Sequence, residues 1–314
     1  MDGTREKIKY GFIIGNIIVA AIFLVFTWLE YQNRENNLKE KNSVYKKYQE
    51  LMNDETIGEE EINDINIKIE ELKNIDELTE KKKTDVFKLA SLLEQKIGKK
   101  ETNYKIAYLT FDDGPYYNTF KVLDILKKNK VKATFFTTTV NGEKCYDNKN
   151  YNCQELYAYY KKDNHTIANH TYTHGWNKGL YKSADNFISA IKRQEDLIKS
   201  KTGIITNIAR FPGGSSTPRI QGGQARLNSM IEALRKNGYG WVDWTAQDGD
   251  GGSLNNRNTG WNNFTSSIND SIEVVLFHDY NKVTTDILPD VIKYLQDKNY
   301  ILLPLFYESV MINK

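Results

Sequence analysis

The first patterned stretch of the chain is almost entirely apolar. Residues 11–29 contain only two polar side chains, Asn16 and Thr27. At about 1.5 Å per residue in a helix, this run is just long enough to cross a hydrocarbon core of roughly 30 Å. Aromatic residues stand at both of its ends, as at membrane interfaces. No small-residue cleavage site follows, which argues against a cleaved signal peptide. We therefore predict a transmembrane anchor over residues 11–31 that contacts the lipid bilayer.

The charges beside this anchor say little about its orientation. Arg5 and Lys7 precede it, but Arg34 and Lys39 follow it, so the positive-inside rule gives almost no bias. We expect a short cytoplasmic tail at residues 1–10 because the tail is short and the bulk of the chain follows the anchor. The expected product is a single-pass protein of the cell membrane, with its larger part extracellular.

Residues 32–104 have a helical composition rich in Lys, Glu, Asn and Ile, and the first proline of the chain is Pro115. Apolar residues recur at spacings of three and four over residues 62–72 and again over residues 86–97. The phase slips between these stripes, so they fall short of the three or four clean heptads of a sustained coiled coil. We predict a helical spacer that forms a hairpin, packs on the following domain, self-associates or remains solvated.

From residue 105 to residue 314, short apolar runs alternate with amphipathic stretches. This β-α order predicts parallel strands with helices outside, in either a barrel or an open sheet. Strands are expected at residues 106–111, 133–138, 166–169, 208–211, 240–246, 273–277 and 301–306. Helices are expected at residues 120–130, 154–162, 184–201, 227–236 and 286–297.

Conspicuous polar groups gather at the C-terminal ends of the predicted strands. They are Asp112, Asp113, His170, Arg210, His278 and, a little beyond its strand, Asp250. In a (β/α) barrel the active site lies at this end of the strands. Several strands therefore point to one site. The net charge of +2 gives no indication of a nucleic-acid partner.

The chemistry at this end indicates hydrolysis. Only four histidines occur in the chain, and two of them, His170 and His174, are four residues apart. Two imidazoles and one carboxylate form a common ligand set for a catalytic divalent metal with an open position. The adjacent pair Asp112 and Asp113 can supply one ligand and one base for the attacking water. This combination favours hydrolysis over redox chemistry or phosphoryl transfer.

Five short motifs in order give the chain a family resemblance. The sequence reads TFDDGP at 110–115, HTYTH at 170–174, RFPGG at 210–214 and LFH at 276–278. A fourth motif is matched in part, because Asp250 is followed by Gly251 where tryptophan is usual. In these motifs the chain resembles NodB-type polysaccharide deacetylases, carbohydrate esterase family four. The resemblance covers residues 106–306 and implies a distorted (β/α) barrel of the polysaccharide deacetylase type.

The resemblance also implies a metal centre. Asp113, His170 and His174 would hold a divalent ion, zinc in the first instance, with Co²⁺, Mn²⁺ or Ni²⁺ as alternatives. Asp112 would be the general base, and Arg210 would keep its carboxylate ionised and correctly aimed.

The remaining roles concern the leaving group and the acetyl group. His278 would be the general acid that protonates the leaving amine, with Asp250 raising its pKa and Asp248 as the rival aspartate. The backbone N–H of Gly213 would stabilise the oxyanion, and Leu276 would line the pocket for the acetyl methyl. The candidates to replace the missing tryptophan are Trp241, Trp244 and Trp261.

These observations predict a membrane-anchored, metal-dependent hydrolase that removes N-acetyl groups from N-acetylglucosamine of cell-wall peptidoglycan. N-acetylmuramic acid, chitin-like oligomers and O-acetyl xylan are alternative substrates. A non-catalytic glycan-binding scaffold is the alternative outside enzymology. It is disfavoured because the base, the acid and all three ligands are present. Outside the membrane, Cys145 and Cys153 can form a disulfide, with two free thiols as the other interpretation.

Overall fold

The computed structural model describes residues 90–91, 93–100, 103–139 and 155–306, together with residues 25, 28, 29 and 32. The chain divides into two compact units, 1–47 and 48–314, and the account below concerns the second. Most of the predicted anchor at 11–31 and of the predicted spacer lies outside the described residues, as do Cys145 and Cys153. Within the described part of the chain, no helix combines the length and hydropathy needed to cross a membrane.

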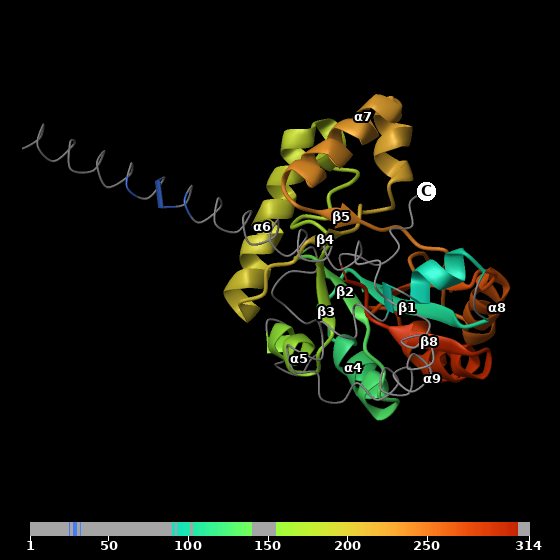
Figure 1. The fold of residues 1–314 in the computed structure, drawn as a ribbon. Helices are drawn as coiled ribbons and strands as arrows, with labels where there is room; N and C mark the ends of the chain where they lie inside the picture. Colours follow the sequence, from blue (N-terminus) through green and yellow to red (C-terminus); the bar gives the residue numbers. More distant parts are fainter. Residues whose placement is uncertain are drawn as a thin grey trace, which may run out of the picture. The chain divides into compact units, whose positions relative to one another are not determined.

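Within the described residues, eight parallel strands form one sheet in the order β5-β4-β3-β2-β1-β7-β6, and β8 also pairs with β1 (Figure 1). The strands are β1 (Lys105–Asp112), β2 (Thr134–Thr137), β3 (Thr166–Asn169), β4 (Ile208–Ala209), β5 (Gly240–Trp241), β6 (Ala246–Gln247), β7 (Ile272–His278) and β8 (Tyr300–Leu303). The central strand β1 places Asp112 opposite Phe136 of β2 on one side and His278 of β7 on the other. The alternating apolar and amphipathic pattern therefore predicted the parallel sheet correctly.

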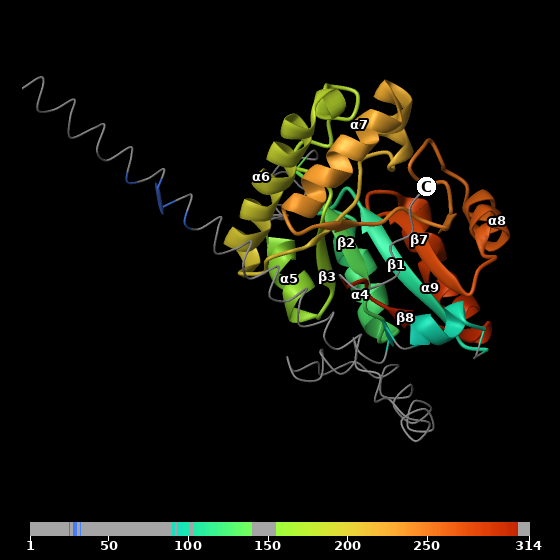
Figure 2. The ribbon, with the colours of Figure 1, turned by 45° about the horizontal axis from the view of Figure 1, so that its top comes forward.

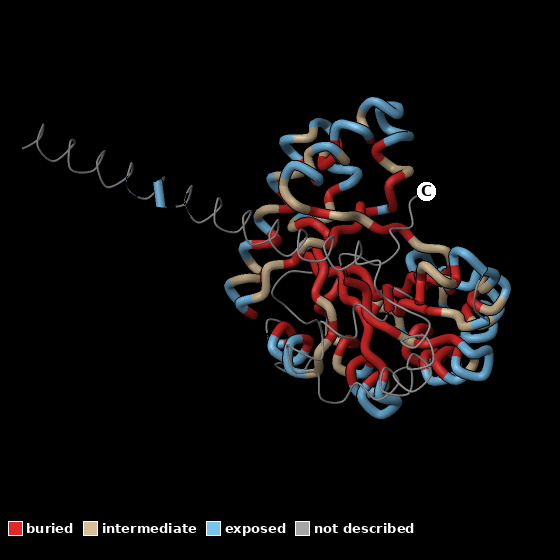
Figure 3. The backbone as a smooth tube through the Cα atoms, in the orientation of Figure 1, coloured by how far each residue is buried: buried red, intermediate tan, exposed pale blue. Residues whose placement is uncertain are grey.

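Helices cover the sheet from outside. They are α4 (Thr119–Lys128), α5 (Leu156–Lys162), α6 (Ala184–Thr202), α7 (Ser216–Lys236), α8 (Arg257–Ser267) and α9 (Lys282–Asp297), with the short 3-10 helix η2 (Leu180–Lys182) before α6. α6 lies against α7, and α8 lies against α9 (Figure 2). Most strand residues are buried, whereas the outer faces of the helices are exposed (Figure 3).

One predicted strand is wrong in a way that shapes the site. Residues 240–246 form two short strands, β5 and β6, at opposite edges of the sheet. Between them, Val242 N–H donates to Ala209 O of β4, and Thr245 N–H donates to Val274 O of β7. The Arg210 guanidinium donates hydrogen bonds to the carbonyl oxygens of Val242 and Asp243, at 3.1 and 2.9 Å. A buried arginine side chain thus pairs with backbone carbonyls that a continuous strand would pair with a neighbouring strand. The parallel sheet as a whole is a half-barrel.

The helix predictions are correct in place and incomplete in extent. The predicted helix at 227–236 is the second half of α7, which starts at Ser216 and is interrupted by non-helical Gly222 and Gly223. Only the part after the interruption carries a buried apolar stripe, so only that part has a periodic signal. α8 was not predicted, because among its side chains Phe264 alone is fully buried.

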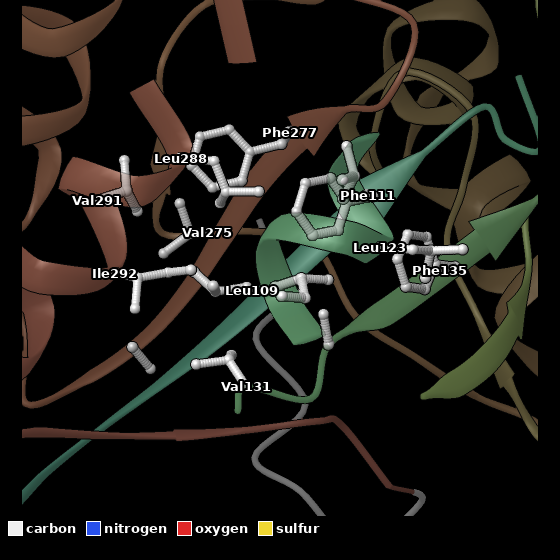
Figure 4. Close-up of a cluster of buried hydrophobic side chains, with 14 of the residues drawn as sticks. Leu109, Phe111, Leu123, Val131, Phe135, Val275, Phe277, Leu288, Val291 and Ile292 are labelled. Atoms are coloured by element: carbon white, nitrogen blue, oxygen red, sulfur yellow. The ribbon is translucent and has the colours of Figure 1, made fainter. Parts of the chain in front are cut away.

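The main core lies between the sheet and helices α4 and α9. The ring of Phe111 stacks between Phe135 and Phe277, at centroid distances of 5.2 and 5.6 Å (Figure 4). Each such buried ring contributes about 1.5–3 kcal/mol. Because side chains alternate along a strand, Phe111 and Phe277 face the helices while their successors Asp112 and His278 face the opposite side. The core therefore fixes the direction in which the candidate catalytic side chains point.

The end of the predicted spacer belongs to this folded unit. Residues 90–91 and 93–98 are helical, and Ala90, Leu93 and Ile97 are buried in a second cluster that includes Ile106 of β1. In addition, the Tyr108 O–H of β1 donates to the buried carboxylate of Glu94. Of the alternatives for the spacer, packing on the following domain is therefore correct for these residues. The predicted boundary at 105 leaves out side chains that complete this core.

Candidate metal centre and catalytic site

The paired carboxylates lie at the end of the central strand β1. Asp112 is the last residue of the strand, and Asp113 follows with a φ of +71°. This left-handed backbone turns the chain, so the two carboxylates serve different neighbours. Asp112 Oδ1 accepts from Arg210 at 2.8 Å, whereas Asp113 Oδ1 lies 3.1 Å from His174 Nε2. Both aspartates are buried.

The two histidines come from the loop after β3. Thr171 and His174 have positive φ values of +64° and +46°, so this segment is a turn and not a helix. The turn brings His170 Nε2 to 3.6 Å and His174 Nε2 to 3.1 Å from the same Asp113 oxygen. One ligand atom from each of the three residues lies within 4.8 Å of the other two. The structure thus brings together all three predicted metal ligands.

These residues fit a divalent metal on the chemistry of their donors. His170 Nδ1 lies 3.0 Å from the carbonyl oxygen of Arg210, which fixes the proton on Nδ1 and leaves the Nε2 lone pair facing Asp113. Burial, with a smaller contribution from His174, holds the pKa of His170 well below its usual value of 6.5. His170 is therefore a neutral imidazole, which is the form that binds metals. Two imidazoles and a carboxylate suit zinc and similar ions.

Asn169 supports this turn and was missed by the sequence analysis. Its side-chain carbonyl accepts from Thr171 N–H at 2.9 Å, and its amide donates to Ile191 O of α6 at 2.8 Å. Asn169 therefore holds the positive-φ residue between the two histidines. An amide at the buried end of a predicted strand was the available signal, but only the folded chain reveals its partners.

Arg210 is fully buried and touches the predicted base directly. Besides Asp112, it donates to the Thr110 hydroxyl at 2.8 Å, and its guanidinium lies 4.1 Å from the centroid of the Phe136 ring. Burial raises the pKa of Asp112 above its usual value of 3.8, and the Arg210 charge opposes this rise. The result is a carboxylate that is a stronger base than an exposed aspartate and remains aimed by a fixed cation.

His278 is paired with Asp250. His278 Nδ1 lies 2.7 Å from Asp250 Oδ1, which leaves Nε2 for the substrate side. Burial by itself lowers the pKa of His278, but the Asp250 carboxylate, together with the charges of Asp113 and Asp112, outweighs burial, and the pKa rises to about 10. Asp248 occupies a different place: its carboxylate accepts the Asp250 backbone N–H at 3.0 Å. Between the two aspartates left open by the sequence, the structure therefore places Asp250 on the imidazole.

Gly213 is the predicted oxyanion donor, and Leu276 is the predicted wall of the acetyl pocket. Gly213 has a φ of +76° within a turn closed by the Gly214 N–H, which donates to Phe211 O at 2.8 Å. The turn does not use the Gly213 N–H. Leu276, on β7 two residues before the acid, is 6% exposed and can offer only a small apolar surface.

None of the three candidate tryptophans has a described ring contact with His278. The Arg235 guanidinium lies over the Trp241 ring. Trp244 packs against the second core cluster, beside Arg210. Trp261 packs on Phe264 and Tyr294. At Gly251 itself, a Cβ atom would come within 2.7 Å of His278 Cε1. The imidazole thus fills the space where a side chain at 251 would begin.

Comparison with known proteins points in one direction. A family model described as polysaccharide deacetylase matches residues 99–231. The solved catalytic domain of a peptidoglycan N-acetylglucosamine deacetylase from Eubacterium rectale is 30% identical, with a TM-score of 0.59 over 67% of this chain and 92% of that domain. A peptidoglycan-N-acetylglucosamine deacetylase of Bacillus cereus is 29% identical over 62% of this chain and 67% of its own length. The chain spans 65% of the length of a Bacillus subtilis relative that is also 29% identical.

Proposed function

We propose that this chain, which belongs to the polysaccharide deacetylase family, hydrolyses the N-acetyl groups of N-acetylglucosamine residues in peptidoglycan. The observation that carries the proposal is one piece of geometry. Asp112 and His278 lie opposite one another on adjacent strands, beside the ligand set of Asp113, His170 and His174. A base and an acid on neighbouring strands, both beside the ligand set, can act on the same reacting group.

In this reaction the protein's own groups move two protons. Asp112, held by Arg210, accepts a proton from the attacking water. His278, kept protonated by Asp250, delivers a proton to the amine nitrogen as the amide bond breaks. This delivery is needed because an amine anion is a poor leaving group. The Gly213 N–H can donate to the oxygen that gains negative charge.

We propose zinc as the ion held by Asp113, His170 and His174, with Co²⁺, Mn²⁺ or Ni²⁺ as alternatives. When bound, such an ion polarises the acetyl carbonyl and makes water more acidic. The nitrogen-rich donor set supports this choice, because Mg²⁺ and Ca²⁺ prefer oxygen ligands.

We further propose that residues 11–31 anchor the protein in the cell membrane and that the deacetylase domain works on the extracellular side. The apolar run supports this proposal. A tethered enzyme reaches an insoluble wall polymer without diffusing away. N-acetylmuramic acid is the second substrate candidate, since it carries the same acetamide.

Product analysis tests the function. Purified protein is incubated with peptidoglycan, with N-acetylglucosamine oligomers and with O-acetyl xylan, and mass spectrometry locates each lost acetyl group. We expect loss from N-acetylglucosamine in the wild type and none with the Asp112→Asn variant. Loss confined to N-acetylmuramic acid or to xylan would overturn the substrate, and no loss from any glycan would overturn the enzyme assignment.

A further inference from the structure

A row of aromatic rings begins at the general acid. The ring of His278 lies 5.3 Å from that of Tyr280, tilted by 45°. The rings of Tyr280 and Tyr116 are nearly perpendicular, with their centroids 6.1 Å apart, and the centroid of the Tyr116 ring lies 4.5 Å from that of Tyr117. All three tyrosines are half-buried, so each keeps part of its surface in solvent. We call Tyr280, Tyr116 and Tyr117 the tyrosine row. It joins the segment after β7 to the segment after β1.

Tyr280 faces the reacting groups and not the core. Asp279 and Tyr280 form a turn after β7, closed by the Asn281 N–H, which donates to His278 O at 3.3 Å, and this turn brings the Tyr280 ring beside that of His278. Asp279 is fully buried and accepts from the hydroxyl of Thr119. Burial, followed by the charges of Asp113 and Asp250, raises the pKa of Tyr280 above its usual value of 10. The phenol therefore stays protonated and lies within the field of the site's carboxylates.

The backbone beside Tyr280 is held from several directions. The Asn281 side chain donates to Asp250 O at 3.0 Å and to Leu254 O at 3.2 Å, and it accepts from Val283 N–H at the start of α9. Asn118 donates to the Asn281 carbonyl at 3.2 Å. A ring on such a support loses little freedom when a ligand covers it, which favours binding.

The neighbouring residue Gly251 cannot serve as an alternative side-chain surface. It has no side chain, and a Cβ there would meet the imidazole of His278 at 2.7 Å. A ligand that reaches His278 therefore meets backbone at Gly251 and an aromatic surface at Tyr280.

We propose that the tyrosine row is a glycan subsite, in which Tyr280, supported by Tyr116, stacks on the sugar ring that carries the acetamide. One face of a pyranose ring presents C–H groups, and an aromatic face is flat, apolar and weakly negative, so the two surfaces are complementary. The Tyr280 hydroxyl can add a hydrogen bond to a sugar oxygen. The subsite takes its substrate class from the proposed function and assigns substrate binding, not proton transfer, to Tyr280.

Binding without turnover tests the subsite. In the Asp112→Asn background, we compare Tyr280→Ala and Tyr280→Phe with the parent for affinity toward the tetramer of N-acetylglucosamine, by calorimetry on the full-length protein. We expect the alanine variant to bind about tenfold more weakly, while the phenylalanine variant stays within about threefold, because the ring face supplies most of the contact. Tyr159→Ala removes another partly exposed tyrosine, on α5, and should leave affinity unchanged.

Kinetic measurements distinguish a role of Tyr280 in substrate binding from a role in positioning the general acid His278. In otherwise wild-type protein, Tyr280→Ala should raise KM by about tenfold and change kcat by less than about threefold. A fall in kcat with unchanged KM would overturn the subsite and make Tyr280 a positioning residue for His278. Equal affinity of the alanine variant and the parent, or no binding by the parent, would also overturn it. Tetramer binding by the wild type without acetate release would instead contradict the proposed function and leave the subsite standing.

Discussion

Each of the two side chains assigned to proton transfer is held by a single partner of opposite charge. Asp112 has Arg210 at 2.8 Å, and His278 has Asp250 at 2.7 Å. All four groups are largely buried, where an unpaired charge is costly. Each pair therefore fixes both the geometry and the protonation state of its catalytic member, so substitutions there should affect rate and pH dependence more than folding.

Asp112→Asn should keep the metal and lose most turnover. The amide still accepts from Arg210 but cannot take a proton, and loss of a general base costs about 10²- to 10⁴-fold in rate. Measuring the bound metal shows whether Asp112 is a base or a metal ligand. The question arises because His170 Nε2 lies 3.5 Å from Asp112 Oδ2 and 3.6 Å from Asp113 Oδ1. We measure initial rates and bound metal together. Loss of metal would make Asp112 a ligand, and a near-wild-type rate would refute its role as base.

Asp250→Asn should shift the alkaline limb of the rate profile to lower pH. A general acid works only while protonated, so activity falls as the pH passes its pKa. Asp250 is the largest influence that raises the pKa of His278, to about 10, against the lowering effect of burial. Removing that charge lowers the pKa and ends activity at a lower pH. Asp248→Asn is the control and should leave the limb nearly in place. A shift in the Asp248 variant alone would reverse the assignment.

Gly251→Ala should impair turnover although it adds a single methyl group. The new Cβ would lie 2.7 Å from His278 Cε1, so the imidazole must move. Misplacing a catalytic group by about 1 Å costs on the order of 10²-fold in rate. The neighbouring variant Gly252→Ala is a matched control, since its Cβ would meet only Gly249 O at 3.9 Å. Equal kcat in the two variants would show that His278 tolerates displacement.

At the scale of elements, periodicity predicted where helices and strands lie but not which contacts they make. The stripe at 86–97 indicated a helix, and the structure packs its described part against β1. Likewise, residues 240–246 were predicted as one strand, yet the two ends of this segment lie at opposite edges of the sheet. In both cases the contact is a tertiary one between separate elements, so local periodicity could not identify it.

Leu93→Ala should destabilise the deacetylase domain. Leu93 is 1% exposed, and truncating a buried leucine to alanine costs about 2–5 kcal/mol. Chemical unfolding followed by fluorescence measures the loss. Lys99→Ala, at an exposed position just beyond the helical residues, should change stability by less than about 0.5 kcal/mol. Equal stability of both variants would mean that residues 90–98 are dispensable for the fold.

At the scale of the whole molecule, the predicted anchor should decide where the protein is found. We expect the full-length protein in the membrane fraction and a chain that begins near residue 86 in the soluble fraction, with activity retained. A start at Lys105 would also remove the anchor, but it would strip Leu93 and Ile97 from their core. Cell fractionation with activity assays checks this. A mature form cut near residue 30 and released into the medium would show a signal peptide instead.

The sheet class and the residues of the candidate site follow from local features of the amino-acid order. The β-α alternation specifies parallel strands, and parallel strands bring their C-terminal ends together, so Asp113, His170 and His278 had to meet at one end. The ordered motifs then selected Asp112 and Arg210. These features are readable because each depends on local spacing or on strand ends.

Only the tertiary structure decided which partners these residues have. The pairing of His278 with Asp250, the bond from Asn169 to Ile191 of α6 and the tyrosine row each join segments separated in the chain. Burial lowers the pKa of His170 and so keeps its imidazole neutral. At His278, burial lowers the pKa whereas Asp250 raises it. Such effects depend on distance and on the exclusion of water, and both arise only when the chain is folded.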